Sequence, residues 1–206
     1  MIKPILRKEE IQSRGREILE ALPLSYPGIE EKRALLLDWE SNWQLEDDSY
    51  VWLSCVEALF GVSEGNFGVG AILVDEKGDI LIQGHNHSFK PDYRSDLHAE
   101  MVVLNEWESH LSGPLENKDN GLRLFSSLEP CPMCFTRLLY SEIKGIHYAA
   151  EDDLGGMQRY VEHMPPFFRS VAKRHNLSRA KASPALLQIA GEIMDLNKES
   201  LDGQIR

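Results

Sequence analysis

Two cysteines form the residue pattern in this chain that could hold a metal ion. Cys131 and Cys134 are three residues apart in Cys-Pro-Met-Cys, so at the start of a helix both thiols would lie on one side and could share one ion. Thiolates select zinc or iron–sulfur chemistry over hard cations. Redox pairs and structural zinc fingers also use C-x-x-C, but a finger requires four protein ligands.

His98 is the clear upstream partner of this cysteine pair, within His98-Ala99-Glu100. Three protein ligands leave the fourth tetrahedral position of zinc for water, as in catalytic sites. Zinc lowers the pKa of bound water to about 7 and so supplies hydroxide near neutral pH. Glu100 is then placed to transfer protons without binding the metal. The alternative for Glu100 is an ordinary exposed residue of a helix.

The elements that position these residues follow from the spacing of apolar side chains. The first 60 residues are predicted to form three helices, the third over about 48–60. Two apolar runs within 67–86 flank a turn and predict a β-hairpin. Helices and strands then alternate: a helix over 98–111 ended by Gly113-Pro114, a strand over 122–128, a helix over 131–143 and a strand over 146–150.

The C-terminal part is predicted to be mostly helical. Residues 157–175 show partly helical spacing, which Pro165-Pro166 must interrupt because proline lacks the helical N–H donor. Residues 178–183 are expected to form a short fifth strand. The spacing over 184–197 predicts an amphipathic helix with Pro184 near its start.

Taken together, H-x-E at 98–100 and P-C-x-x-C at 130–134 resemble the signature of the zinc-dependent cytidine/deoxycytidylate deaminase superfamily. The resemblance runs from about residue 67 to 151. It implies an α/β fold with three layers, α/β/α, around a mixed five-stranded sheet. On this basis residues 1–60 are expected to be a helical N-terminal extension and residues 61–206 a zinc-dependent deaminase domain. The extension could cover the pocket, build a dimer or bind a partner.

The resemblance also implies roles for individual residues. His98, Cys131 and Cys134 are expected to bind Zn2+, with Glu100 as general acid and base. The residues expected to line the substrate pocket are Phe67, Asn86, Ala99 and Pro130. Asn86 should hydrogen-bond the base, although a turn asparagine is the alternative. Its neighbours His85 and His87 are expected at the surface and not as ligands.

The expected reaction is hydrolytic conversion of an amino group on a nucleobase, nucleoside or nucleotide to a carbonyl, with release of ammonia. A helix between two last parallel strands would resemble the branch that holds tRNA adenosine deaminases and bacterial guanine deaminases. The net charge of -11 favours a small substrate over a polyanion. Six basic residues between Arg159 and Lys181, against one acid, keep tRNA adenosine deamination to inosine as an alternative.

A further alternative is a non-catalytic zinc-binding partner subunit of the same fold, which would not need Glu100. Resemblance to the family suggests a homodimer. No run of about 18 apolar residues is present, so we expect no membrane span. The first residues lack the apolar region of a secretory signal, and three cysteines suit a reducing compartment, so a cytoplasmic location is expected.

Overall fold

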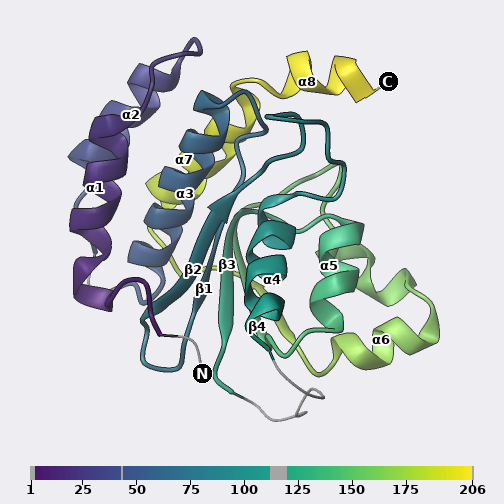
Figure 1. The fold of residues 1–206 in the computed structure, drawn as a ribbon. Coiled ribbons are helices and arrows are strands. Elements are labelled where there is room, and N and C mark those ends of the chain that lie inside the picture. Colours follow the sequence, from purple (N-terminus) through teal and green to yellow (C-terminus); the bar gives the residue numbers. More distant parts are fainter. Residues whose placement is uncertain (1–2, 43, 112–119, 206) are drawn as a thin grey trace.

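The computed structural model describes residues 3–42, 44–111 and 120–205, with a five-stranded sheet at the centre (Figure 1). The strands are β1 (Gly70–Val74), β2 (Ile80–His85), β3 (Arg123–Leu128), β4 (Gly145–Ala150) and β5 (Asn176–Arg179). They lie in the order β2-β1-β3-β4-β5. β1 pairs antiparallel with β2 and β3, whereas β3, β4 and β5 are parallel. The expected mixed sheet with parallel last strands is confirmed.

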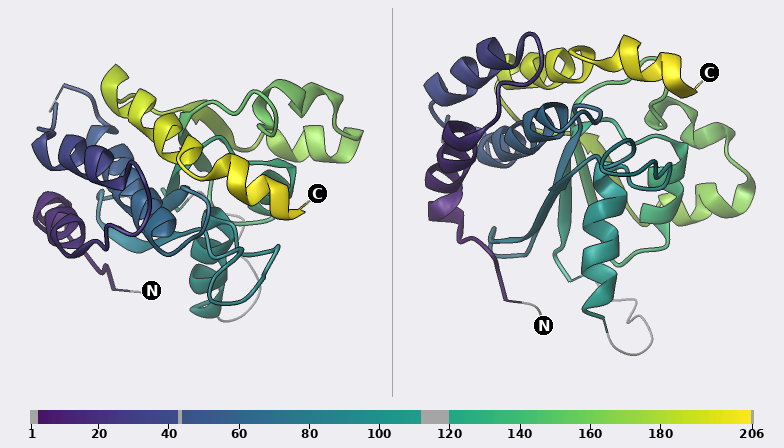
Figure 2. Two further views of the ribbon diagram at one scale, coloured as in Figure 1. Left: turned by 90° about the horizontal axis from the view of Figure 1, so that it is seen from above. Right: turned by 45° about the horizontal axis from the view of Figure 1, so that its top comes forward.

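Helices cover both faces of the sheet, which confirms the expected three layers (Figure 2). On one face α3 (Asp48–Ser63) and α7 (Pro184–Asp195) contact each other and the strands. On the other face lie α4 (Ala99–Ser109) and α5 (Pro132–Leu139), with α6 (Pro166–Ala172) packed against α5. None of the described helices is both long and apolar enough to cross a membrane.

The alternation of side chains along β1 builds two hydrophobic cores. All five residues of β1 are buried, as expected for a strand covered on both faces. Ile72 and Val74 belong to the core under α3 and α7, whereas Ala71 and Leu73 belong to the core under α4 and α5. Both helical layers are therefore stabilised by the same strand.

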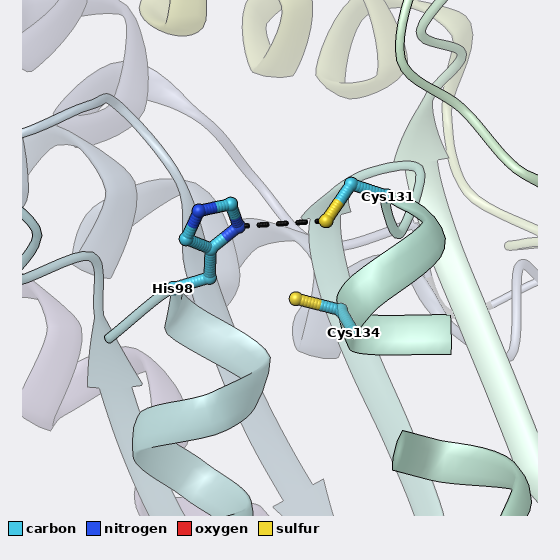
Figure 3. A group of neighbouring side chains, drawn as sticks. All are labelled: His98, Cys131 and Cys134. Atoms are coloured by element: carbon cyan, nitrogen blue, oxygen red, sulfur yellow. Dashed lines mark hydrogen bonds between the residues drawn. The ribbon is translucent and has the colours of Figure 1, made fainter. Parts of the chain in front are cut away.

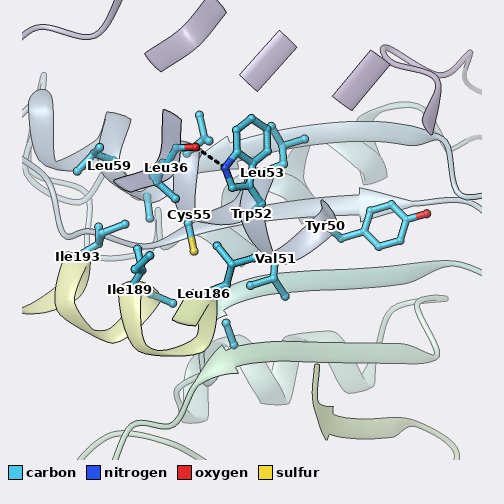
Figure 4. Packing of buried hydrophobic residues seen from close by; sticks show 14 of the residues in the cluster. Leu36, Tyr50, Val51, Trp52, Leu53, Cys55, Leu59, Leu186, Ile189 and Ile193 are labelled. Carbon is cyan, nitrogen blue, oxygen red and sulfur yellow. Dashed lines mark hydrogen bonds between the residues drawn. The ribbon is translucent and has the colours of Figure 1, made fainter. Parts of the chain in front are cut away.

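The first two helices, α1 (Ile11–Ala21) and α2 (Ile29–Asp38), pack on the outer side of α3 (Figure 1). Trp52 of α3 connects them: its indole N–H donates to the Leu36 carbonyl at 2.9 Å (Figure 4). The Trp52 ring also stacks on Trp39, with centroids 5.3 Å apart. Gly15 of α1 lies against the same ring. α1 and α2 thus lie on the face opposite to α4 and α5.

A domain boundary at residue 60 would cut α3, which continues to Ser63. Almost every side chain of α3 is buried, and the helix contacts β1, β2 and β3. We therefore propose that the domain containing the sheet begins with α3, and that α1 and α2 are the addition.

Two C-terminal elements differ from the predicted ones. β5 begins at Asn176, before the expected strand, because Asn176 N–H donates to the Lys144 carbonyl at 2.7 Å and continues the parallel ladder. A further helix, α8 (Lys198–Ile205), follows α7 and was not predicted. The interruption at Pro165-Pro166 is confirmed, since a 3-10 helix (Gln158–His163) precedes it and α6 follows. Gly113-Pro114 lies outside the described residues.

Replacing Gly15 by alanine is expected to destabilise the fold. A Cβ at Gly15 would lie 2.2 Å from the Trp52 ring, so the indole must shift; we expect unfolding free energy to fall by about 1–3 kcal/mol. Gly203→Ala is the matched control, because nothing lies within 4 Å of its added Cβ, and it should stabilise α8 by about 0.5–1 kcal/mol. Urea unfolding of both variants checks this, and equal effects of the two substitutions would contradict it.

Candidate metal centre

His98 and Cys131 occupy the same position in two different helices. Each is the residue directly before a helix, His98 before α4 and Cys131 before α5, and each has extended backbone with ψ of 159 and 168. Neither side chain caps its helix, so the imidazole and the thiol remain available for other partners. Figure 3 shows both side chains and Cys134 pointing toward one another.

The three donors meet the spacing that a zinc ion requires. The distance from His98 Nδ1 to Cys131 Sγ is 3.6 Å, and the three ligand atoms all lie within 4.8 Å of one another. Tetrahedral zinc with bonds of about 2.0 Å to nitrogen and about 2.3 Å to sulfur separates these two atoms by about 3.5 Å. The donor set and its spacing therefore fit a zinc ion.

The pKa values of the two cysteine thiols are shifted in opposite directions. Hydrogen bonding from Cys134, opposed by burial and assisted by His98, lowers the pKa of Cys131 to about 4. The hydrogen bond with Cys131 and burial raise the pKa of Cys134. The thiolate that a metal ion needs is thus already favoured at one of the two sulfurs.

Glu100 is buried, in contrast to an ordinary helical glutamate. It lies in the first turn of α4 and is 3% exposed. The Ser126 hydroxyl of β3 donates to Oε1 at 3.3 Å, and burial, followed by the charge of Cys131, raises the pKa of the carboxyl. The structure therefore brings the carboxylate to the same end of the sheet as the three donors, and the exposed-residue alternative is wrong.

Of the expected pocket residues, Asn86 makes the best-defined contacts. It follows β2, is buried, and its N–H donates to the Val69 carbonyl at 2.9 Å. Its side-chain Oδ1 accepts from Ser88 N–H at 2.9 Å, which is an Asx turn. The next residue, His87, donates its N–H to the Leu97 carbonyl directly before His98. The turn role expected as an alternative is thus present, and the His87 backbone bond links this turn to the residue before His98.

The other three expected pocket residues are related to the centre by chain position or by a shared core. Phe67 and Ala99 belong to the same hydrophobic cluster as Cys134. Pro130 precedes Cys131, and its carbonyl accepts from Met157 N–H at 3.2 Å. Ala99 and Pro130 are thus next to two of the donors in the chain, Phe67 shares a core with the third, and contact with a substrate stays a prediction.

Glu129 is a buried carboxylate that the sequence analysis did not single out. Its oxygens accept from Gln158 N–H at 2.7 Å and from Asp152 N–H at 3.2 Å, so it holds the loop after β4 against the segment before Cys131. Gly156 permits this approach, because a Cβ there would lie 2.3 Å from the Glu129 carboxyl carbon. The pair of glycines at 155–156 is the local signal that could have indicated such a contact.

The expectation that His85 lies at the surface is wrong. It is 6% exposed because α3 covers this face of β2. Its Nδ1 lies 2.9 Å from a Glu57 carboxylate oxygen and its Nε2 lies 3.0 Å from Glu64 Oε2. Burial lowers the pKa of His85, but the hydrogen bonds and charges of Glu57 and Glu64 outweigh it, and the net shift is upward. His87 is half-buried.

The basic segment between Arg159 and Lys181 does not form one surface beside the centre. Three of its cations pair with acids: Arg159 with Asp153, Arg179 with Glu151 and Lys181 with Glu46. Two others, Lys173 and Arg174, line a groove of about 520 Å³ at the starts of the parallel strands. Arg123 and Lys144 line the same groove. Because Cys131 follows the end of β3, the groove and the centre lie at opposite ends of this strand.

The chain resembles deaminases in both sequence and fold. It is 34% identical over 112 residues to a tRNA-specific adenosine deaminase of Bacillus subtilis. The aligned region covers 54% of this chain and 66% of that protein, so the chain spans just under two thirds of the length of this relative. A solved structure from work on tRNA:A34 deaminases superposes with a TM-score of 0.50 and 24% identity over 68% of this chain and 94% of that one. A structure of guanine deaminase from Nitrosomonas europaea superposes with a TM-score of 0.56 and 17% identity, over 82% of this chain and 92% of that one.

These two structural likenesses indicate a shared fold. The family described as the cytidine and deoxycytidylate deaminase zinc-binding region matches residues 45–150, which is more than half of the chain. The match begins just before α3 and includes all four residues of the centre. The chain therefore belongs to the zinc-binding cytidine and deoxycytidylate deaminase family, and its cofactor is Zn2+.

Proposed function

We propose that this chain is a hydrolytic deaminase in which His98, Cys131 and Cys134 bind the zinc ion and Glu100 transfers protons. The observation that carries this proposal is the burial of a carboxylate beside a set of three donors. A three-residue ligand set suits a catalytic ion, because it leaves a coordination position open. A non-catalytic partner subunit would have no use for Glu100 in this place.

The roles of the chain's own residues follow from their positions. Zinc, when bound, polarises water and lowers its pKa. The Glu100 carboxylate accepts a proton from the attacking water and delivers it to a ring nitrogen of the base. It then takes the second proton from the newly added hydroxyl and gives it to the amino group, which leaves as ammonia. The Ser126 hydroxyl donates to Oε1 and so helps to orient this carboxylate. Water is consumed, the exocyclic C–N bond breaks, and a carbonyl and ammonia are formed.

As substrate we propose adenosine in tRNA, converted to inosine. The support is that the curated relative from Bacillus subtilis is a tRNA-specific adenosine deaminase. The basic groove at the other end of the parallel strands offers phosphate contacts, which a large RNA could reach while its base enters the centre. A homodimer and a cytoplasmic location stay predictions.

A free nucleobase, nucleoside or nucleotide is the second candidate substrate. The observation that favours it is the net charge of -11, which repels polyanions. The pairing of Arg159, Arg179 and Lys181 with acids further reduces the positive charge available to RNA.

A substrate panel distinguishes the two candidates. We expect inosine to form in tRNA transcripts, detected by mass spectrometry of digested RNA, and we expect tRNA affinity to fall as salt rises because counterions are released on binding. Guanine, adenine, cytosine and their nucleosides and nucleotides are the controls. Ammonia release from a free base, together with no inosine in tRNA, would contradict the tRNA proposal and support the second candidate.

Glu100→Gln is expected to lower kcat by about 10²- to 10⁴-fold, because the amide cannot accept and return a proton. Zinc content should not change, since Glu100 is not one of the three proposed ligands. Glu106→Gln is the control on the same helix, where the carboxylate is exposed and pairs only with His110 among the described residues. Equal activity of the Glu100 variant and the parent protein would show that the proton-transfer role is wrong.

Cys134→Ala is expected to remove the ion from the proposed centre, because two remaining donors do not close a zinc site. Cys55→Ala is the matched control: Cys55 is buried in α3, and burial raises the pKa of its thiol to about 12, so it is a poor ligand. Absorption of the Co2+-substituted proteins measures sulfur coordination directly. Retention of the sulfur-to-metal band in the Cys134 variant would exclude Cys134 as a ligand.

A further inference from the structure

A second group of metal-ligand side chains lies at the end of β2, apart from the centre described above. Glu64, His85 and His87 each offer one ligand atom, and these atoms lie within 4.8 Å of one another. Glu64 Oε2 lies 3.0 Å from His85 Nε2 and 3.8 Å from His87 Nδ1. Tetrahedral zinc bound by nitrogen and oxygen would separate such atoms by about 3.4 Å, so small side-chain adjustments suffice.

Glu57 orients His85 in the way that carboxylates orient metal-binding histidines. Its buried Oε2 lies 2.9 Å from His85 Nδ1 and would accept the Nδ1 proton, which leaves Nε2, 3.0 Å from Glu64 Oε2, as the ligand atom once an ion has displaced its proton to solvent. Glu57 Oε1 is in turn held by Gln83 Nε2 at 2.8 Å. The buried imidazole of His85 is therefore fixed by a further partner.

The charge of the group also favours a cation. Glu57 and Glu64 contribute two carboxylates, and in the described part of the chain their ion-pair partners are His85 and His87 alone, without lysine or arginine. Two carboxylates therefore lie around a partly buried pair of imidazoles, where their charge attracts a cation. A divalent ion would neutralise both.

The group is accessible from solvent on one side. The Glu64 and His87 side chains are 40% and 31% exposed, whereas His85 and Glu57 are 8% and 7% exposed. An ion can therefore enter past Glu64 and His87 and complete its coordination with water, while the buried pair fixes its position.

We propose that Glu64, His85 and His87 form a second metal site, which binds a divalent transition-metal ion such as Zn2+. Imidazole is a borderline ligand that suits zinc and other divalent transition metals, and zinc also accepts a carboxylate oxygen beside histidines. Glu64 follows the last residue of α3, and the two histidines flank Asn86. The ion would tie the end of α3 to the segment that carries Asn86, so its role is structural.

Co2+ titration of the metal-free protein tests this proposal, because the two sites differ in sulfur. We expect about two equivalents of Co2+ per chain, one with sulfur-to-metal charge-transfer absorption and one without it. His87→Ala and, separately, Glu64→Ala should lose the sulfur-free equivalent and keep the charge-transfer band. Both side chains are partly exposed, so these variants should fold. Glu57→Gln should weaken the second site by about 10- to 100-fold.

His110→Ala is the matched control, because His110 is an exposed histidine that pairs with Glu106 alone among the described residues. It should keep both equivalents. A parent protein that binds one equivalent, or a His87 variant with the full stoichiometry of the parent, overturns the second site. Neither outcome affects the proposed deaminase centre, which the charge-transfer band reports independently.

Discussion

The start of α4 and the start of α5 must meet at one end of the sheet, and much of the structure serves this constraint. β3 ends at Leu128 and α5 begins at Pro132, so a short connection places Cys131 at the strand end. α4 approaches from the hairpin side, where the His87 to Leu97 backbone hydrogen bond closes the loop before His98. Extended backbone at both helix starts then directs one imidazole and one thiol toward each other. The two helices thus position His98 and Cys131, and the first turns of the same helices place Glu100 and Cys134 beside them.

Buried carboxylates hold the surrounding segments, and backbone N–H groups satisfy several of them. Glu129 fixes the loop after β4, as described above. Asp48 Oδ1 accepts from Ser183 N–H at 2.7 Å and Asp47 Oδ2 accepts from Lys181 N–H at 2.7 Å, which connects the start of α3 to the segment between β5 and α7. An uncompensated buried carboxylate is costly, so these bonds specify one arrangement of the connections. Some of the acidic residues behind the chain's negative net charge thus hold the structure together by accepting backbone hydrogen bonds.

The helical additions stabilise the face of the sheet opposite α4 and α5. α1 and α2 pack around Trp52 of α3, and α3 packs on the strands. This position does not suit a cover over the centre, which was one of the expected roles. At the other end of the chain, Asn197 Nδ2 donates to the Asn66 carbonyl at 2.6 Å, and Leu201 of α8 is buried in the cluster that contains Phe67. The C-terminal helices, not the N-terminal ones, therefore lie near the expected pocket.

The sequence by itself determined the donor set, the hairpin and the alternation of strands and helices, because ligand chemistry depends on atom type and short spacing, and apolar periodicity is local. His98, Cys131 and Cys134 could be singled out in this way, whereas Glu100 gained its expected role mainly from the open zinc position and the family resemblance. Tertiary structure alone decided that His85 is buried between Glu57 and Glu64, that Glu129 holds a distant loop, and that the basic groove lies away from the centre. The contacts of His85 and Glu129 join residues from 21 to 29 positions apart, so no local pattern identifies both partners. Burial of a polar side chain is decided by what packs over it, and that partner comes from elsewhere in the chain.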